Sequence, residues 1–299
     1  MTIAAHGRPC LDMGARRGHE RAAVSAARAS VIGGFAGTSD LEAGKRYGIP
    51  VIGTAAHAFT LLHDSERQAF DAQIASLGPN TTLLVDTYNV TEGVKTAVEA
   101  ARAAGGELGA VRLDSGDLVA QAFTVRGQLD ALGATSTKIT VTSDLDEYAI
   151  AALGAAPVDS YGVGTRLITG SGVPTAALVY KLVSREDSNG NMVGVAKKSA
   201  SKNTVAGKKY AGRLYDEDGY ASEEILFTGS AEEAAAFFEE NGARPLQVPL
   251  IVDGEIQSEA WSSQALSEAQ AHHLRSRNEL PYQAWRLSEG EPAIPTRYI

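Results

Sequence analysis

The sequence predicts an α/β fold built around a parallel sheet, and two features support this prediction. Between about residues 50 and 183, short runs of apolar and β-branched residues alternate with helix-like segments. The apolar runs are nearly continuous, which is typical of strands buried on both faces of a parallel sheet. No G-x-G-x-x-G follows a first strand, so a dinucleotide-binding sheet loses its main support. A doubly wound sheet and a barrel both remain possible at this point.

The elements follow one another in a regular order along this region. We expect helices over 65–78, 91–106, 116–133 and 144–154, and strands over 50–56, 81–87, 109–115, 137–143, 158–165 and 176–184. Ser65 and Thr91 are the expected N-caps of the first two helices. Gly78, Gly105 and Gly133 are expected to end the first three. The stretch before residue 13 shows no strand and no cap, so we expect the sequence to open in the middle of a domain.

The character of the chain changes near residue 184. The following segment is polar and rich in turns, with a hairpin-like run around Asp216–Gly219 and a short amphipathic helix over 230–241. We therefore predict a catalytic α/β core over residues 1–183, incomplete at its N-terminus, and a smaller C-terminal subdomain over residues 184–299.

Composition limits the classes of function. The 299 residues carry a net charge of −9, which argues against general nucleic-acid binding but permits a cationic pocket for small anions. No stretch approaches the roughly 18 apolar residues of a membrane span. The start has no apolar leader segment, and the single cysteine, Cys10, excludes an internal disulfide. These features together favour a cytoplasmic protein.

Polar residues gather where five successive strands are expected to end. Parallel α/β folds build active sites at that edge from several strands. The residues are His57, Asp86, Arg112 with Asp114, Ser143 with Asp144, and Gly162, Gly164 and Thr165 of the "GVGT" loop.

Each of these residues also has a purely structural interpretation. His57 alone suits a core position, although its small neighbours leave room for a bulky ligand. Arg112 and Asp114, two apart on a strand, point to the same face and either pair with each other or serve a ligand. Asp144 suits a helix N-cap equally well. The "GVGT" loop is either an ordinary turn or a cradle of backbone N–H groups for a phosphate.

Two basic groups are ambiguous in the same way. Arg16 and Arg17 suit a solvated helix face. The lysines at 197, 198, 202, 208 and 209 suit a solvated loop, or a loop close to a polyphosphate.

Several motifs occur in an order that resembles one known family. They are "GARRGHE", "GFAGTSDLEAGKRYGIPVIGTAAHAF", "LLVDTYNVTEGV", "VRLDSGDL", "VTSDLDE" and "YGVGTRL". The chain resembles nicotinate phosphoribosyltransferases of the bacterial type over essentially its whole length. The resemblance implies a type II phosphoribosyltransferase fold, which is an irregular parallel α/β barrel with flanking domains. It also implies synthesis of nicotinate mononucleotide from nicotinate and phosphoribosyl pyrophosphate (PRPP) in NAD biosynthesis, with Mg²⁺ and with ATP as co-substrate.

The resemblance also assigns roles to residues. His57 matches a histidine that is phosphorylated by ATP, and Asp86 an aspartate that orients it. Arg112 and Asp114 match residues that hold the ribose-phosphate and its reacting centre. The remaining expected binding residues are Arg16 at the pyridine, Thr38, Ser39, Ser143 and Asp144 at the substrates, and Gly162, Gly164 and Thr165 at the 5′-phosphate. No residue is assigned as a metal ligand.

One position bears on the choice of substrate. Related nicotinamide enzymes carry an aspartate at the place of Ser39, where a carboxylate accepts from a carboxamide but repels the carboxylate of nicotinate. Ser39 therefore favours nicotinate, with Asp40 expected to point away from the site.

The resemblance leaves one marked difference, because family members begin with an additional N-terminal domain that helps close the barrel. We therefore expect weak or absent activity from this chain alone. The resemblance also implies that the full-length proteins form homodimers. The alternatives are a non-catalytic fragment that binds phosphate ligands, or a nicotinamide or quinolinate enzyme. The histidine motif argues against the quinolinate enzyme.

Overall fold

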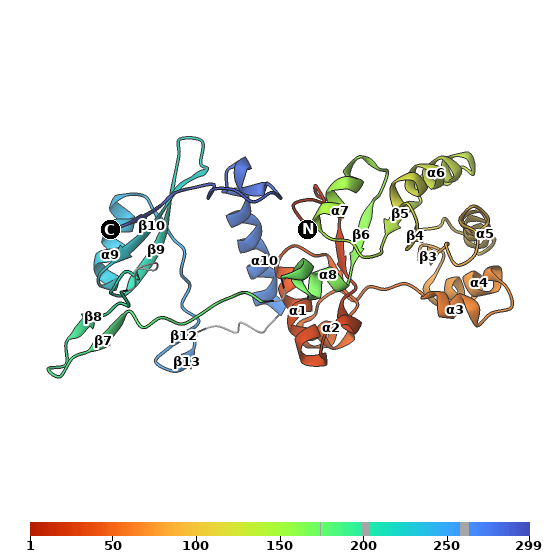
Figure 1. The fold of residues 1–299 in the computed structure, drawn as a ribbon. Helices are drawn as coiled ribbons and strands as arrows, with labels where there is room; N and C mark the ends of the chain where they lie inside the picture. The colour runs from red at the N-terminus through yellow and green to blue at the C-terminus, as the bar shows by residue number, and fades with distance from the viewer. Residues whose placement is uncertain (174, 199–203, 258–262) are drawn as a thin grey trace. The chain divides into compact units, whose positions relative to one another are not determined.

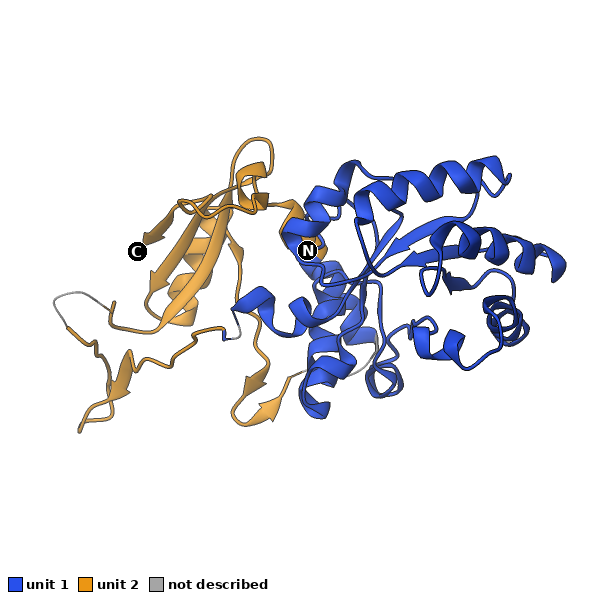
Figure 2. Cartoon of the chain, turned by 45° about the vertical axis from the view of Figure 1, so that its right-hand side comes forward, with its two compact units in different colours: residues 1–175, 261–273 blue, residues 176–260, 274–299 orange. Residues whose placement is uncertain are grey.

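The computed structural model describes residues 1–173, 175–198, 204–257 and 263–299, which form two compact units (Figure 2). Unit 1 comprises Met1–Thr175 with Trp261–His273, and unit 2 comprises Ala176–Ala260 with Leu274–Ile299. The boundary lies eight residues before the predicted one at 183/184. The physical reason is that residues 176–182 are exposed and lie outside any helix or strand. The chain also returns to unit 1, where Leu266 is buried against Val24 and Val31.

Unit 1 is built on a six-stranded parallel sheet, as predicted (Figure 1). The strand order is β2-β1-β6-β5-β4-β3, and the sheet curves into half a barrel. The strands are β1 (Cys10–Asp12), β2 (Gly37–Thr38), β3 (Thr82–Leu84), β4 (Ala110–Leu113), β5 (Lys138–Val141) and β6 (Ser160–Val163). The parallel register aligns Leu83, Val111 and Ile139, all fully buried, across three neighbouring strands. The apolar runs therefore form a core covered on both faces.

Three expectations about the strands are wrong. A strand, β1, does precede residue 13, and it lies inside the sheet between β2 and β6. The predicted strand over 50–56 is reduced to one bridge between Val51 and Thr38. The segment expected as a strand over 176–184 contains only the first residue of β7 (Ser184–Glu186).

The helices of unit 1 surround the strands (Figure 2). They are α1 (Glu20–Ile32), α2 (Leu41–Tyr47), α3 (His57–Leu61), α4 (Glu66–Leu77), α5 (Val90–Ala103), α6 (Leu118–Ala131), α7 (Glu147–Ala152) and α8 (Thr165–Ile168), with short 3₁₀ turns at Ala15–Arg17, Leu153–Ala155 and Gly170–Gly172.

The helix caps confirm part of the prediction. Ser65 caps α4 by accepting from the backbone N–H of Gln68, and α4 ends at Gly78, as expected. The cap of α5 is Asn89, whose side chain accepts from the Glu92 N–H, so the prediction of Thr91 is wrong. Asn89 lies at the junction between extended and helical backbone, which is the position where a side-chain acceptor can reach the free N–H groups.

Unit 2 contains a four-stranded sheet in the order β11-β9-β10-β14. The predicted hairpin joins β9 (Lys209–Tyr215) to β10 (Ala221–Thr228), and the Asp216 side chain accepts from the Asp218 and Tyr220 N–H groups in its turn. The predicted short helix is α9 (Ala231–Glu240), closed by a capping box from Ser230 and Glu233. The other elements are β7, β8 (Met192–Gly194), β11 (Arg244–Pro245), β12 (Ile251–Val252), β13 (Glu255–Ile256), β14 (Thr296–Tyr298) and a 3₁₀ turn at Tyr282–Trp285.

The last long helix, α10 (Ser263–Asn278), begins in unit 1 and ends in unit 2. Among the described residues, no helix combines the length and the apolar character needed to cross a membrane.

Candidate functional site

A cavity of about 560 Å³ opens at the carboxyl ends of the parallel strands of unit 1. Nearly every residue predicted to bind a ligand lies in its wall. Those residues are Arg16, Ser39, His57, Arg112, Asp114, Ser143, Asp144, Gly162, Gly164 and Thr165. The wall also contains residues not predicted for it, namely Met13, Ala15, Arg17, Gly53, Thr54, Ala56, Leu84 and Thr142.

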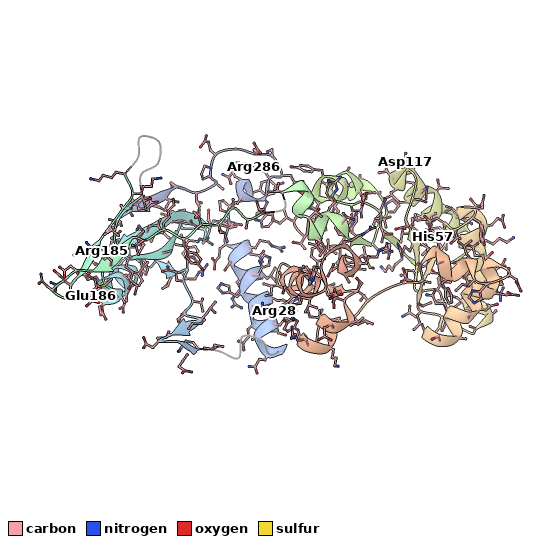
Figure 3. All side chains as sticks on the ribbon, turned by 60° about the horizontal axis from the view of Figure 1, so that its bottom comes forward. Arg28, His57, Asp117, Arg185, Glu186 and Arg286 are labelled. Carbon is pink, nitrogen blue, oxygen red and sulfur yellow. The ribbon has the colours of Figure 1, made fainter. Side chains whose placement is uncertain are left out.

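His57 is the first residue of α3 (Figure 3), and it lies in the cavity wall. Its side chain is 40% exposed, so the core interpretation of this histidine is wrong. Nδ1 lies 3.1 Å from the hydroxyl of Thr87. Nε2 lies 3.7 Å from Asp114 Oδ2 and 3.8 Å from Asp86 Oδ1, beyond hydrogen-bonding distance. The two ring nitrogens therefore have different neighbours: Nδ1 has a hydroxyl, and Nε2 has two carboxylates.

Asp86 is not among the residues of the cavity wall. Its side chain is 2% exposed, and Oδ2 accepts from the Asp114 N–H at 2.8 Å and the Ser115 hydroxyl at 2.9 Å. Within the described chain, Oδ1 is buried without a hydrogen-bond partner. Asp86 Oδ1 lies 3.8 Å from His57 Nε2, slightly too far for a hydrogen bond, so the orienting role implied for Asp86 stays a prediction.

Arg112, on β4, is held by three side chains. Its Nε donates to Thr142 at 2.8 Å, Nη1 to Thr54 at 2.6 Å and Nη2 to Asp114 at 2.7 Å. The predicted pairing of Arg112 with Asp114 and their place in the site are therefore both present. Neither hydroxyl was predicted, because Thr54 and Thr142 come from segments 58 and 30 residues away.

The surroundings of Asp114 keep it ionised. Burial raises the pKa of this carboxyl, but hydrogen bonds from Thr142 and Arg112, together with the charges of Arg112 and His57, outweigh burial and lower the pKa below its usual value. Asp114 therefore supplies a fixed negative charge to the cavity.

Ser143 and Asp144 follow β5 in an unusual backbone conformation. Ser143 has φ of +139°, which L-residues rarely adopt and which is often found at functional sites. Asp144 does not cap the next helix, because Asp146 does so by accepting from the Tyr148 and Ala149 N–H groups. The cap interpretation of Asp144 is therefore wrong, and its carboxylate is available in the cavity wall.

The "GVGT" loop joins β6 to α8 at the cavity. A Cβ on Gly162 would overlap the Thr142 methyl group, so the close approach of β6 to β5 requires glycine there. Gly164 has φ of −116° and ψ of −95° and starts α8.

Arg16 and Arg17 form a 3₁₀ turn directly after β1. Both line the cavity, both are exposed, and neither side chain makes a hydrogen bond or ion pair with another described residue. Their charges are therefore free to meet an anionic ligand.

Thr38 and Asp12 form the base of this region. Thr38 is fully buried and donates to Asp12 Oδ2 at 2.7 Å, while Asp12 Oδ1 accepts from the Gly14 N–H at 2.7 Å. Thr38 therefore supports the turn carrying Arg16 and does not line the cavity, which corrects its expected role as a binding residue. Burial raises the pKa of Asp12 despite these hydrogen bonds, and the charge of Asp40 raises it further. Sequence reasoning missed Asp12 because β1 was not predicted.

Ser39 and Asp40 lie as the sequence predicted. Ser39 is in the cavity wall, whereas the Asp40 side chain accepts from the Ala43 N–H and caps α2. Asp40 thus points away from the cavity.

The predicted basic run lies in unit 2, and Lys202 lies outside the described residues. Lys209 donates to the carbonyls of Val205 and Gly207, and Lys208 lies over the ring of Tyr210. These contacts fit a local structural role for the two lysines.

The described residues were compared with the clusters of carboxylates, imidazoles and thiols that hold metal ions. Within residues 1–173, 175–198, 204–257 and 263–299, no group of three or more His, Cys, Asp or Glu is arranged to hold a metal ion.

Comparison with known proteins places this arrangement in a family. Residues 9–218 match the model of the nicotinate phosphoribosyltransferase (NAPRTase) family. Nicotinate phosphoribosyltransferase pncB1 of Mycobacterium tuberculosis is 50% identical over 307 aligned residues, covering 100% of this chain and 65% of that protein. The nicotinate phosphoribosyltransferase of Bacillus subtilis is 41% identical over 221 residues, covering 71% of this chain and 45% of that protein. The chain thus spans less than two thirds of the first relative and less than half of the second.

Solved structures share the fold. Human nicotinic acid phosphoribosyltransferase matches with a TM-score of 0.72 at 23% identity, covering 96% of this chain and 68% of the human chain. Nicotinate-nucleotide pyrophosphorylase from Pyrococcus furiosus matches with a TM-score of 0.69 at 24% identity, covering 93% of this chain and 67% of the Pyrococcus chain. These likenesses establish the type II phosphoribosyltransferase fold for the described elements. Together with the family match over residues 9–218, they show that this chain belongs to the nicotinate phosphoribosyltransferase family.

Proposed function

We propose that this protein forms nicotinate mononucleotide from nicotinate and PRPP, for NAD biosynthesis, with coupled ATP hydrolysis. The observation that carries the proposal is the composition of the cavity wall. Two arginines without partners among the described residues, an ionised Asp114 and the "GVGT" loop all meet in it. This combination suits a substrate that carries phosphates and reacts at a sugar carbon.

The charges in the cavity match those that develop in the reaction. Displacement of pyrophosphate from the ribose leaves positive character on the anomeric carbon and negative charge on the leaving group. The Asp114 carboxylate would stabilise the first, and the arginines and backbone N–H groups of the "GVGT" loop would bind phosphates. Arg112 is immobilised by its three hydrogen bonds, so little reorganisation is needed when PRPP binds.

Mg²⁺ fits the residues of the cavity as a partner of the substrate. Asp114 and Asp144 both lie in the wall, and Mg²⁺ is commonly bound by one or two carboxylates together with substrate phosphates. We propose these two residues as its protein ligands. The ion would neutralise the departing pyrophosphate.

His57 is proposed as the acceptor of a phosphoryl group from ATP. It is the exposed imidazole of the cavity, and neutral imidazole is a good nucleophile toward phosphorus. The homodimer of the full-length family and a cytoplasmic location are part of the same proposal. The buried, unpaired Cys10 suits a reducing compartment.

Turnover of nicotinate and nicotinamide tests the proposed substrate. The purified chain is incubated with PRPP, ATP, Mg²⁺ and either pyridine, and the mononucleotide is quantified by chromatography. We expect nicotinate to be preferred, and Ser39→Asp to lower its turnover about tenfold because a carboxylate would face that of nicotinate. Ser39→Asn adds similar bulk without charge and is the matched control.

Two results would count against this assignment. Faster turnover of nicotinamide than of nicotinate by the wild type would show that Ser39 does not set the preference. PRPP binding without formation of either mononucleotide would favour a non-catalytic phosphate-binding fragment, which the incomplete coverage of the relatives keeps as the second candidate.

A further inference from the structure

The hydroxyl of Thr142 links Arg112, on β4, to Asp114, the residue just after that strand. Arg112 Nε donates to Thr142 Oγ1 at 2.8 Å, and Thr142 Oγ1 donates to Asp114 Oδ1. Arg112 also bonds Asp114 directly, because its Nη2 donates to the same Oδ1 at 2.7 Å. The three side chains, all from the cavity wall, therefore form a closed ring of hydrogen bonds.

The charges of Arg112 and Asp114 decide the direction of these hydrogen bonds. A guanidinium only donates, and an ionised carboxylate only accepts. The Thr142 hydroxyl therefore accepts from Arg112 and gives its one proton to Asp114. The Leu113 carbonyl, 3.4 Å from Thr142 Oγ1, is a weaker acceptor because it carries no charge. Thr142 thus uses its acceptor and its donor at the same time.

These hydrogen bonds make the two carboxylate oxygens of Asp114 different from each other. Oδ1 accepts from both Arg112 and Thr142, whereas no described residue forms a hydrogen bond with Oδ2. Oδ2 lies 3.7 Å from Nε2 of His57, another residue of the cavity wall. Two donors at one oxygen fix the plane of the carboxylate and leave the other oxygen free for a substrate.

The methyl group of Thr142 holds the hydroxyl in this orientation. Thr142 is buried, and its Cγ2 would lie 2.4 Å from a Cβ built on Gly162 of the "GVGT" loop. The methyl group therefore fills the space that the absence of a side chain at Gly162 leaves open. A β-branched side chain has few χ1 rotamers, so packing of the methyl group against β6 directs the hydroxyl toward Arg112 and Asp114.

We propose that Thr142 is a positioning residue that holds Arg112 and Asp114 in the arrangement needed for the reaction. This inference rests on the proposed transfer of the phosphoribosyl group to nicotinate, in which Asp114 faces the reacting carbon of PRPP. Because the hydroxyl fixes the carboxylate before PRPP binds, little reorganisation is needed as positive charge develops on that carbon. Loss of the hydroxyl should therefore cost the transition state more than the bound substrate.

The contact can be measured without any substrate. The full chain is labelled with ¹⁵N-arginine, and the Nε–H signal of Arg112 is assigned by its loss in Arg112→Lys. Thr142→Val keeps the shape of the side chain without its hydroxyl, and is expected to shift this signal and to speed its exchange with solvent. Thr142→Ser restores the hydroxyl and is expected to restore the wild-type signal. Thr137→Val is the matched control, because it removes a buried hydroxyl that donates to the Leu108 carbonyl, outside the cavity wall.

A second measurement follows the reaction. With nicotinate, PRPP, ATP and Mg²⁺, kcat for the mononucleotide is expected to fall about tenfold in Thr142→Val, the size expected for one lost hydrogen bond to a charged group. It should stay near the wild-type value in Thr142→Ser and in Thr137→Val. The KM for PRPP should change much less than kcat. Thr142→Ala gives the same test if valine impairs folding.

The two measurements separate the inference from the function on which it rests. An unchanged Arg112 Nε–H signal in Thr142→Val and Thr142→Ala, or an active wild type whose kcat both variants equal, would overturn the positioning role. A shifted signal in Thr142→Val, together with a wild type that forms no mononucleotide, would support the contact and count against the proposed reaction.

Discussion

Arg112 illustrates at the scale of one residue how the site is organised. All of its polar groups donate to neighbours in the cavity wall, so its charge is held in place. Arg16 and Arg17 make no such bonds with described residues and keep their charges for a ligand. Arg112 therefore gives the cavity a positive charge at a fixed position, whereas Arg16 and Arg17 can adjust to the shape of an anionic ligand.

Glu66 gives a prediction about pH at the same scale. Burial, and then the charge of Asp86, raise its pKa to about 6, and its Oε1 is buried without a partner among the described residues. The folded state therefore binds this proton more readily than the unfolded state, so the contribution of Glu66 to stability falls as pH rises from about 4.5 to about 6. Glu66→Gln should stabilise the protein by about 1 kcal/mol at pH 7.5, after allowance for solvent screening.

Urea unfolding of the wild type and Glu66→Gln at pH 4 and pH 7.5 tests this prediction. The advantage of the variant should be present at pH 7.5 and absent at pH 4. Glu92→Gln changes an exposed residue in the first turn of α5 and provides the baseline. An advantage of Glu66→Gln that is the same at both pH values would show that Glu66 is not desolvated as described.

The sequence allowed the charged residues of the site to be predicted better than its hydroxyls. His57, Arg112 and Asp114 follow apolar runs at a recognisable place, and the cavity contains all three. The supporting hydroxyls of Thr54, Thr87 and Thr142 give no such signal, because threonine is common at strand ends. Their role depends on which segments the sheet brings together.

At the scale of elements, one glycine sets how closely α5 packs on the sheet. A Cβ on Gly93 would overlap the carbonyl oxygen of Val85, the residue just after β3. Gly93→Ala should therefore push α5 away from the strand that leads to Asp86 and Thr87. We expect a loss of about 2 kcal/mol in stability, the cost of overpacking less the gain in helix propensity.

Thermal unfolding and ¹⁵N-histidine spectra together test this packing. Gly93→Ala should lower the melting temperature and shift the His57 signals. Gly127→Ala, in α6, is the control because a Cβ there meets no atom within 4 Å. A Gly93→Ala protein as stable as the Gly127→Ala protein would contradict the close approach of α5 to β3.

The elements that could be predicted differ physically from those that could not. The strands β3 to β6 are short apolar runs between helices of ten or more residues or clear turn signals, and each was expected near its observed place. The strands β1 (CLD) and β2 (GT) do not lie in an apolar run, whereas β3, which also has three residues, lies in the run "TTLLVDT". They form because the fold brings β1 beside β2 and β6, which lie far from it in the sequence.

At the scale of the whole molecule, the chain crosses between its two units more than once. Leu266 of α10 is 5% exposed and packs in unit 1 with Val24, Val31 and Tyr47. Leu266→Ala should remove about 3 kcal/mol of stability from unit 1 by leaving a cavity. Hydrogen exchange should show faster opening of α1 and α2, with β9 and β10 unchanged. Equal acceleration in β9 and β10 would contradict the assignment of Leu266 to unit 1.

Binding of PRPP tests the central claim most directly, because every residue of the cavity wall lies in unit 1. Titration calorimetry of the 299-residue chain with PRPP and Mg²⁺ should show one site, with binding at least about tenfold weaker in Arg112→Met. Arg67→Met, at an exposed ion pair on α4, should bind as the wild type does. Absence of PRPP binding by the wild type, or equal affinity in Arg112→Met, would contradict the assignment of this cavity as the phosphoribosyl site.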